Sequence, residues 1–184
     1  MAVPIQGDIT KPAWKVGDEW AYRYEGPSGS GTFVWTVDRI ETMGSLPHYV
    51  IRTGNREIFY RTSDFAFTEE RVGGQIVRQN TPSEWRTVVF PLSVGKAWDM
   101  KYHEARPADR QTEDVERTCQ AESEETIKVP AGAFKTIRVV CKNKLSGAWI
   151  QTSWYAPEAR QAVRLELAAT GGRQIRELLI HKLR

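Results

Sequence analysis

Two cysteines are the residues of this sequence whose types and spacing could do chemistry together. Cys119 and Cys141 flank a turn of sequence V-P-A-G-A. If Pro130–Gly132 form a three-residue loop, Val129 pairs with Ala133, and the even spacings from there put both sulfurs on one face of a hairpin. The cysteines then lie diagonally across the hairpin, or directly opposite if one bulge intervenes. We therefore predict a buried disulfide, with two reduced core cysteines as the alternative.

The same face of this predicted hairpin is apolar. It carries Ile127, Val129, Ile137 and Val139 beside the sulfurs in this register. A disulfide implies an oxidising compartment. A zinc site would need further ligands, and none of the 3 histidines lies at ligand spacing from a cysteine. We therefore expect a structural disulfide and no metal.

Catalytic motifs are missing from the sequence. There is no G-x-S-x-G elbow for a serine nucleophile and no P-loop for a nucleotide. His103 lies beside Glu104, but adjacent strand residues face opposite sides of a sheet and cannot form one dyad. The acidic residues between Asp109 and Glu125 alternate with arginines and lack the spacing of a calcium loop. We expect neither an enzyme nor a cofactor.

Aromatic residues are abundant, with 7 Trp, 6 Tyr and 6 Phe. Many of them alternate with polar residues, so they share one face of each predicted strand. Such a face is either a filled core or the wall of an apolar pocket. The residues that we predict to face a ligand are Trp20, Tyr22, Tyr24, Phe33, Trp35, Trp98, Tyr102 and Trp154.

Alternation of this kind predicts antiparallel strands along most of the chain. Gly73-Gly74 and Gly171-Gly172 are typical of tight hairpin turns, and no window shows a long amphipathic helix. Without helices to cover a sheet, its apolar face must be buried by the sheet itself. We predict an all-β protein whose curved antiparallel sheet forms a half-barrel or a sandwich, with few or no helices.

One motif occurs twice. The pattern V-G-x-x-W-x-x-x-Y begins at Val16 and again at Val94. This repeat predicts two strand meanders related by duplication, the second longer because of extra residues around 107–125. The predicted organisation is an N-terminal extension (1–13) and a single β domain (14–184), with pseudo-repeats at about 14–79 and 92–184 joined by a linker (80–91).

Composition limits the partners. Apolar residues make up 40% and charged residues 27%, with a net charge of +3. Because the charges and the aromatic residues alternate onto opposite faces, we expect no nucleic acid partner. No apolar run reaches the roughly 18 residues of a transmembrane helix, and residues 1–12 lack the pattern of a signal peptide. The chain is either cytoplasmic or exported with its signal removed, and the cysteines favour export.

Three segments carry a family resemblance. They read W-K-V-G-D-E-W-A-Y from Trp14, V-P-A-G-A-F-K-T from Val129 and W-Y-A-P-E from Trp154. In this order they resemble an uncharacterised group of exported bacterial proteins that includes lipoproteins. The resemblance implies a curved antiparallel sheet, similar to the half-barrel of the lipoprotein carriers LolA and LolB. It also implies a periplasmic or outer-membrane-anchored location, and it brings no catalytic residues.

Two functions follow from these observations. The first is a non-enzymatic envelope module that binds an apolar or amphipathic small molecule, a lipid or an envelope protein on its aromatic face. The second is a structural or assembly protein that pairs with a partner through an exposed strand edge, with Gln174–Leu183 as the favoured edge. A membrane tether lost with the export signal is compatible with either function.

Overall fold

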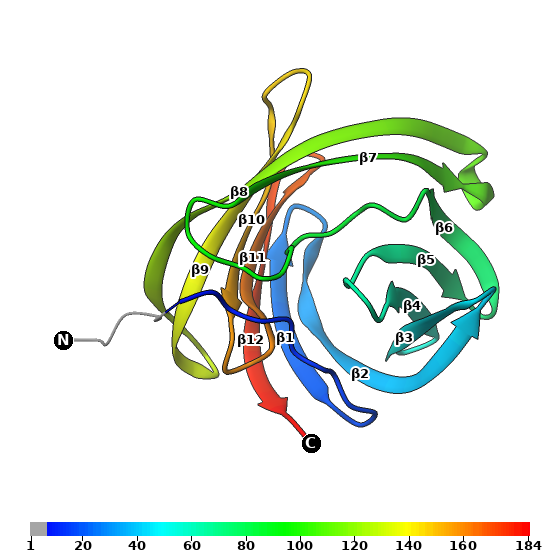
Figure 1. Ribbon diagram of the computed structural model, residues 1–184. Helices are drawn as coiled ribbons and strands as arrows, with labels where there is room; N and C mark the ends of the chain where they lie inside the picture. Colours follow the sequence, from blue (N-terminus) through cyan, green and yellow to red (C-terminus); the bar gives the residue numbers. More distant parts are fainter. Residues whose placement is uncertain (1–6) are drawn as a thin grey trace.

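Twelve antiparallel strands close into one barrel in the computed structural model, which describes residues 7–184 (Figure 1). The alternating residues named above form strands because β-branched and aromatic side chains fit a pleated, half-buried surface. The strands are β1 (Glu19–Gly26), β2 (Gly29–Met43), β3 (Leu46–Thr53), β4 (Arg56–Arg61), β5 (Phe67–Val72), β6 (Gln75–Thr81), β7 (Ala97–Arg106), β8 (Gln111–Val129), β9 (Gly132–Asn143), β10 (Trp149–Ala156), β11 (Gln161–Ala169) and β12 (Gly172–Lys182).

The all-β prediction is confirmed, but the open half-barrel or sandwich is wrong. Each strand pairs with its sequence neighbours, and β12 closes the ring by pairing with β1. The terminal strand Gln174–Leu183 therefore has no free edge, because β12 lies between β11 and β1. Closure leaves each strand a partner on both sides, and this removes the edges that an open sheet would expose.

The weakest join in the barrel lies between β6 and β7. Only Gln79, Asn80 and Thr81 of β6 pair with β7. The chain between these two strands does not bulge outward. It runs across one end of the barrel, next to the N-terminal segment (Figure 1), and Ile9 forms a β-bridge with Leu92. We call this segment, residues 82–96, the plug; it contains most of the predicted linker 80–91.

Two apolar clusters fill the interior, and the plug touches both. The first contains Trp20 and Tyr22, and the second contains Met100, Tyr102 and the two cysteines. Trp85 of the plug packs against both clusters, with ring-centroid distances of 5.2 Å to Phe67 and 6.4 Å to Tyr102. The backbone of Arg86 is tied to β7, since its oxygen accepts a hydrogen bond from Trp98 Nε1 at 3.0 Å.

The two halves of the barrel carry matching backbone features. Gly17 donates its N–H to the Val37 oxygen, and Gly95 donates in the same way to Ala121, both at 2.8 Å. A register shift follows Val37 in the β2–β3 pair and follows Ala121 in the β8–β9 pair. Both glycines have a positive φ, of 93° and 91°, which a side chain would disfavour. The V-G-x-x-W motif thus begins an equivalent strand in each half.

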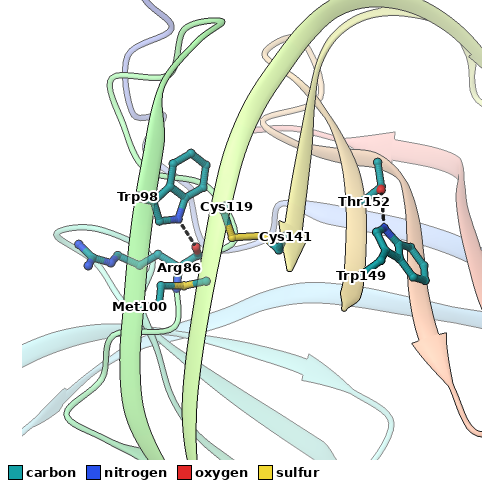
Figure 2. Close-up of a disulfide and its surroundings, with 7 residues drawn as sticks. All are labelled: Arg86, Trp98, Met100, Cys119, Cys141, Trp149 and Thr152. Atoms are coloured by element: carbon teal, nitrogen blue, oxygen red, sulfur yellow. Dashed lines mark hydrogen bonds between the residues drawn. A yellow bond between two sulfur atoms is a disulfide. The ribbon is translucent and has the colours of Figure 1, made fainter. Parts of the chain in front are cut away.

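The β8–β9 hairpin confirms the disulfide and corrects its predicted register. Val129 pairs with Gly132, so the turn has two residues instead of three. The register shift after Ala121 compensates, and Cys119 lies directly opposite Cys141, joined to it by a disulfide (Figure 2). The same shift moves Ile127 and Val129 away from the sulfurs and into the other apolar cluster.

Helical structure is minimal in residues 7–184. One 3-10 turn, Pro107–Asp109, lies between β7 and β8. None of the described residues forms a helix long and apolar enough to cross a membrane.

Candidate functional site

The predicted aromatic lining divides between several places. Trp20 is fully buried and Tyr22 is 2% exposed, so both are filled core. Tyr22 also stacks on Phe33 and meets Trp35 edge-on, at centroid distances of 5.3 and 5.9 Å. Tyr24 contacts Phe33 and borders an open groove at the outer rim. Only Trp35 of these residues reaches a cavity inside the barrel.

Two of the remaining predicted residues belong to the second cluster. Tyr102 is 2% exposed, and Trp98 packs against the same cluster without being fully buried. Arg117 lies over the Tyr102 ring, with its guanidinium carbon 5.9 Å from the ring centroid. Trp98 lies near the disulfide (Figure 2), Tyr102 belongs to the same cluster as the two cysteines, and neither residue lines the inner cavity.

Trp154 lies on the outer face of the barrel, opposite to the predicted lining. Its neighbours Ser153 and Tyr155 point inward, so alternation turns Trp154 outward. There its Nε1 donates a hydrogen bond to Glu125 at 2.9 Å, and Arg138 and Arg164 lie 5.9 and 5.5 Å from its ring centroid. Side chains of the neighbouring strands β8, β9 and β11 therefore surround Trp154 on this face, and it takes no part in the interior.

A small cavity of about 70 Å³ lies inside the barrel beneath the plug. Aromatic side chains form much of its wall: Trp14, Trp35, Tyr60, Phe65, Phe90 and Tyr155. Phe90 meets Tyr155 and Phe65 edge-on, at centroid distances of 5.4 and 6.0 Å. A volume of this size holds only one or two waters or the end of a small molecule.

An open cleft of about 390 Å³ lies directly outside this cavity. It is bordered by Lys11 of the N-terminal segment, by Asp64 between β4 and β5, and by Arg86 and Val89 of the plug. Phe90 borders both spaces. The Phe90 ring is therefore the partition between a solvent-facing cleft of ligand size and the inner cavity.

One wall of the inner cavity is polar. Ser153 and Tyr155 are 1% and 3% exposed, and their hydroxyl oxygens have no hydrogen-bond partner among the described residues. Arg160 lines the same cavity. Burial raises the pKa of Tyr155, and the positive charge of Arg160 acts in the opposite direction. The cavity thus combines aromatic walls with two unpaired hydroxyls and a guanidinium.

Two loops with unusual backbone geometry hold the cavity walls in place. Phe65, between β4 and β5, has a φ of 59°, and Arg160, between β10 and β11, has a φ of 53°. Left-handed conformations are uncommon for residues with a side chain. Trp14 Nε1 donates a 3.0 Å hydrogen bond to the Arg160 oxygen, which fixes that loop against the N-terminal segment.

A buried carboxylate supports the same region. Asp18 is fully buried, and it accepts hydrogen bonds from the backbone N–H of Lys15 at 2.9 Å and of Arg184 at 2.7 Å. Arg160 Nη1 lies 3.5 Å from Asp18 Oδ2. Asp18 therefore joins the N-terminal segment, the C-terminus and the cavity loop at one end of the barrel.

Histidine chemistry is not assembled at this site. His103 is exposed and its Nδ1 donates a 2.9 Å hydrogen bond to Asp114, whereas Glu104 faces the interior and pairs with Arg78 and Arg106. This placement confirms that His103 and Glu104 point to opposite faces. His48 contacts Thr68 at 3.0 Å, away from the cavity.

Comparison with known proteins gives distant likenesses only. No family model matches the chain, and no curated protein matches it. A Bacteroides fragilis protein described as exported, with a YmcC-like fold, is 15% identical at a TM-score of 0.49, covering 96% of this chain and 100% of its own. A Parabacteroides distasonis protein described as a lipoprotein is 13% identical at a TM-score of 0.43, with the same coverage. The hypothetical lipoprotein YmcC of Escherichia coli is 11% identical at a TM-score of 0.45, covering 88% of this chain and 83% of its own.

Most cavity residues were missed by the sequence prediction. Phe90 was placed in a linker, and Phe65 lies in a loop without an alternating pattern. Ser153 and Tyr155 flank Trp154, the first residue of the W-Y-A-P motif. The motif therefore indicated the right strand, but the predicted residue faces the opposite side of the sheet. Whether their hydroxyls find a hydrogen-bond partner depends on tertiary contacts, so it could not be predicted from the sequence.

Proposed function

We propose that this chain is an exported, non-enzymatic binding module for a small amphipathic molecule, one end of which lies inside the barrel. One observation carries the proposal: a cavity with aromatic walls and two unpaired hydroxyls meets an open cleft at a single ring, Phe90. Concave sites that are mostly apolar, with a few convergent polar groups, are the usual form of small-molecule sites.

The proposed export rests on the disulfide. Cys119 and Cys141 are bonded to each other, and residues 7–184 contain no free cysteine. Disulfides persist in oxidising compartments and are rare in the cytosol. This favours a location outside the cytoplasm, and periplasmic or outer-membrane attachment is an extension of the same proposal.

The alternative, assembly through strand edges, has less support. Barrel closure pairs β12 on both sides, and the incomplete edge that is left lies at the short β6–β7 join. A protein that self-associates through this join would elute as an oligomer, and a monomer would count against this alternative.

Fluorescence titration tests the binding proposal, because two of the seven tryptophans, Trp14 and Trp35, line the inner cavity. Octanoate and 1-octanol are the probes, with calorimetry as a second readout. We expect saturable one-to-one binding of at least one probe. The Phe90→Ala variant should bind that probe at least fivefold more tightly, because the substitution joins the cavity to the cleft. Leu145→Ala is the matched control, since Leu145 is an exposed apolar side chain. Absence of saturable binding of either probe to the wild-type chain would contradict the proposal.

A further inference from the structure

Resting on the proposed function, we infer that the ligand carries a carboxylate, which Ser153, Tyr155 and Arg160 bind at the inner end of the cavity. The two hydroxyls lie two residues apart on the inner face of β10, and the guanidinium comes from the adjoining loop. These three groups line a cavity that Thr87 and Gln161 also border, and its remaining lining residues are aromatic or aliphatic.

The two hydroxyls require a partner. A buried polar group without a hydrogen bond costs about 1–3 kcal/mol, and native proteins contain few such groups. Here Ser153 Oγ and Tyr155 Oη both lack a partner in the part of the chain that the structure describes, and both residues line the same empty space. A ligand with hydrogen-bond acceptors in this space would give these hydroxyls the partners that they lack.

Arg160 forms a long ion pair with buried Asp18 and still has unused hydrogen-bond donors. Its Nη1 has two protein contacts, the Ala13 oxygen and Asp18 Oδ2, both at 3.5 Å, the outer limit of a hydrogen bond. A guanidinium has five N–H donors in a planar fork that fits a carboxylate. The loop holds Arg160 in place through its backbone, because Trp14 donates to its carbonyl oxygen.

These groups select one ligand chemistry. A carboxylate only accepts hydrogen bonds, so its two oxygens can accept them from the hydroxyls and from the guanidinium. An alcohol can use the hydroxyls but gains little from the charge of Arg160, and an ammonium group would be repelled by that charge. The geometry therefore favours an anion over a neutral or cationic head group.

Comparison of the two halves shows that the cation lies on one side of the cavity only. The register shift after Phe59 in β4 matches the shift after Trp154 in β10, so Tyr60 corresponds to Tyr155. Phe65 and Arg160 share a left-handed conformation in the following loops. One half thus presents an aromatic ring where the other presents a cation, and the chain of the ligand is expected to leave past Phe90 toward the open cleft.

Three probes of equal chain length separate the possibilities: octanoate, 1-octanol and octylamine. Calorimetry at neutral pH should give octanoate at least tenfold tighter binding than the other two. Arg160→Gln should lower octanoate affinity at least tenfold and leave octanol affinity within twofold. Ser153→Ala and Tyr155→Phe are smaller changes, and each should lower the affinity for octanoate several-fold.

A matched control isolates the charge at this position. Arg110 also has a left-handed conformation, with a φ of 52°, but it is exposed beside the 3-10 turn. Arg110→Gln should leave octanoate binding unchanged, and near-UV circular dichroism checks that each variant is folded. Equal affinity for octanoate and octanol, unaffected by Arg160→Gln, would overturn the inference that the ligand is a carboxylate. The proposal that the chain is a binding module would still stand. Absence of binding by all three probes would overturn both.

Discussion

Single buried charges determine how the ends of this chain are held. Asp18 is the clearest case, because it is fully buried and accepts hydrogen bonds from backbone groups near both ends of the domain. A buried carboxylate of this kind is stabilising only while its partners are present. Its neighbour Gly17, two residues before β1, has a positive φ and forms the turn that leads into the strand.

Replacing Asp18 tests this role. Asp18→Asn keeps the shape but turns one acceptor oxygen into a donor, which then faces a backbone N–H. We expect the free energy of unfolding in urea to fall by about 2 kcal/mol. Asp109→Asn, in the exposed 3-10 turn, is the control and should change it by less than about 0.5 kcal/mol. Equal stability of the two variants would show that Asp18 does not stabilise the fold by connecting the two ends of the chain.

Glu104 makes stability depend on pH. Burial alone would raise its pKa, but hydrogen bonds and charge from Arg78 and Arg106 hold the pKa below its usual value. A carboxyl group whose pKa is lower when folded adds stability above its unfolded pKa, about 4.3. That stability is lost as the pH falls below this value through the folded pKa.

Glu104→Gln should therefore be less stable than wild type at pH 7, by about 3 kcal/mol, because the arginines lose their buried counter-charge. The difference should narrow as the pH falls below about 4, where the wild-type carboxyl also becomes neutral. Urea unfolding at pH 7, 5 and 3 measures both effects, with Glu158→Gln, at an exposed position between β10 and β11, as the control. Parallel stability curves for wild type and Glu104→Gln would contradict the prediction.

At the scale of elements, the β8–β9 hairpin shows what local pattern can and cannot predict. Alternation correctly placed both cysteines on one face, because side-chain direction along a strand is a local property. The two-residue turn and the shift after Ala121 are choices of backbone geometry that the residue types alone did not decide. That shift moved Ile127 and Val129 into a different cluster from the sulfurs.

The disulfide is expected to stabilise this hairpin chiefly by restricting the unfolded chain. With a separation of 22 residues, its loss should cost about 3 kcal/mol. The double variant Cys119→Ala/Cys141→Ala should match the reduced wild-type chain in urea unfolding and should not respond to dithiothreitol. If reduction of the wild type left its midpoint unchanged, the disulfide would have no stabilising role.

The conformations of the β4–β5 and β10–β11 loops could not be predicted, for a different reason. Phe65 and Arg160 adopt left-handed conformations without the glycine that usually marks them. Tertiary contacts impose these conformations, such as the hydrogen bond from Trp14 to Arg160 across 146 residues of sequence. Sequence patterns that extend over a few residues carry no information about such contacts, so the cavity walls stayed hidden.

Closure of the barrel belongs to the whole molecule. The repeated V-G-x-x-W motif predicted two related halves, and each half contributes six of the twelve strands. Matching hydrogen bonds, register shifts and left-handed loops support the duplication, which stays a prediction. Closure could not be predicted from the strands themselves, because it depends on β1 meeting β12 more than 140 residues later.

The plug gives the clearest test of whether the halves act as one unit. Trp85 contacts Phe67 of the first half and Tyr102 of the second, and it packs against both core clusters. Trp85→Ala should lower the free energy of unfolding by about 3–5 kcal/mol, the usual cost of truncating a large packed aromatic. Because the same ring supports both halves, the loss should appear as one shifted transition.

Two probes decide this point. Tryptophan fluorescence follows a set of residues concentrated in the first cluster, which contains Trp14 and Trp20, whereas far-UV circular dichroism follows the strands of both halves. Coincident transitions in wild type and in Trp85→Ala are expected, since a closed ring cannot lose one half without opening the other's edges. Leu145→Ala, at an exposed loop, should leave both curves unchanged. Separate transitions in the wild-type chain would show that the halves unfold independently, and the plug would then be a spacer between two units rather than the part that joins them.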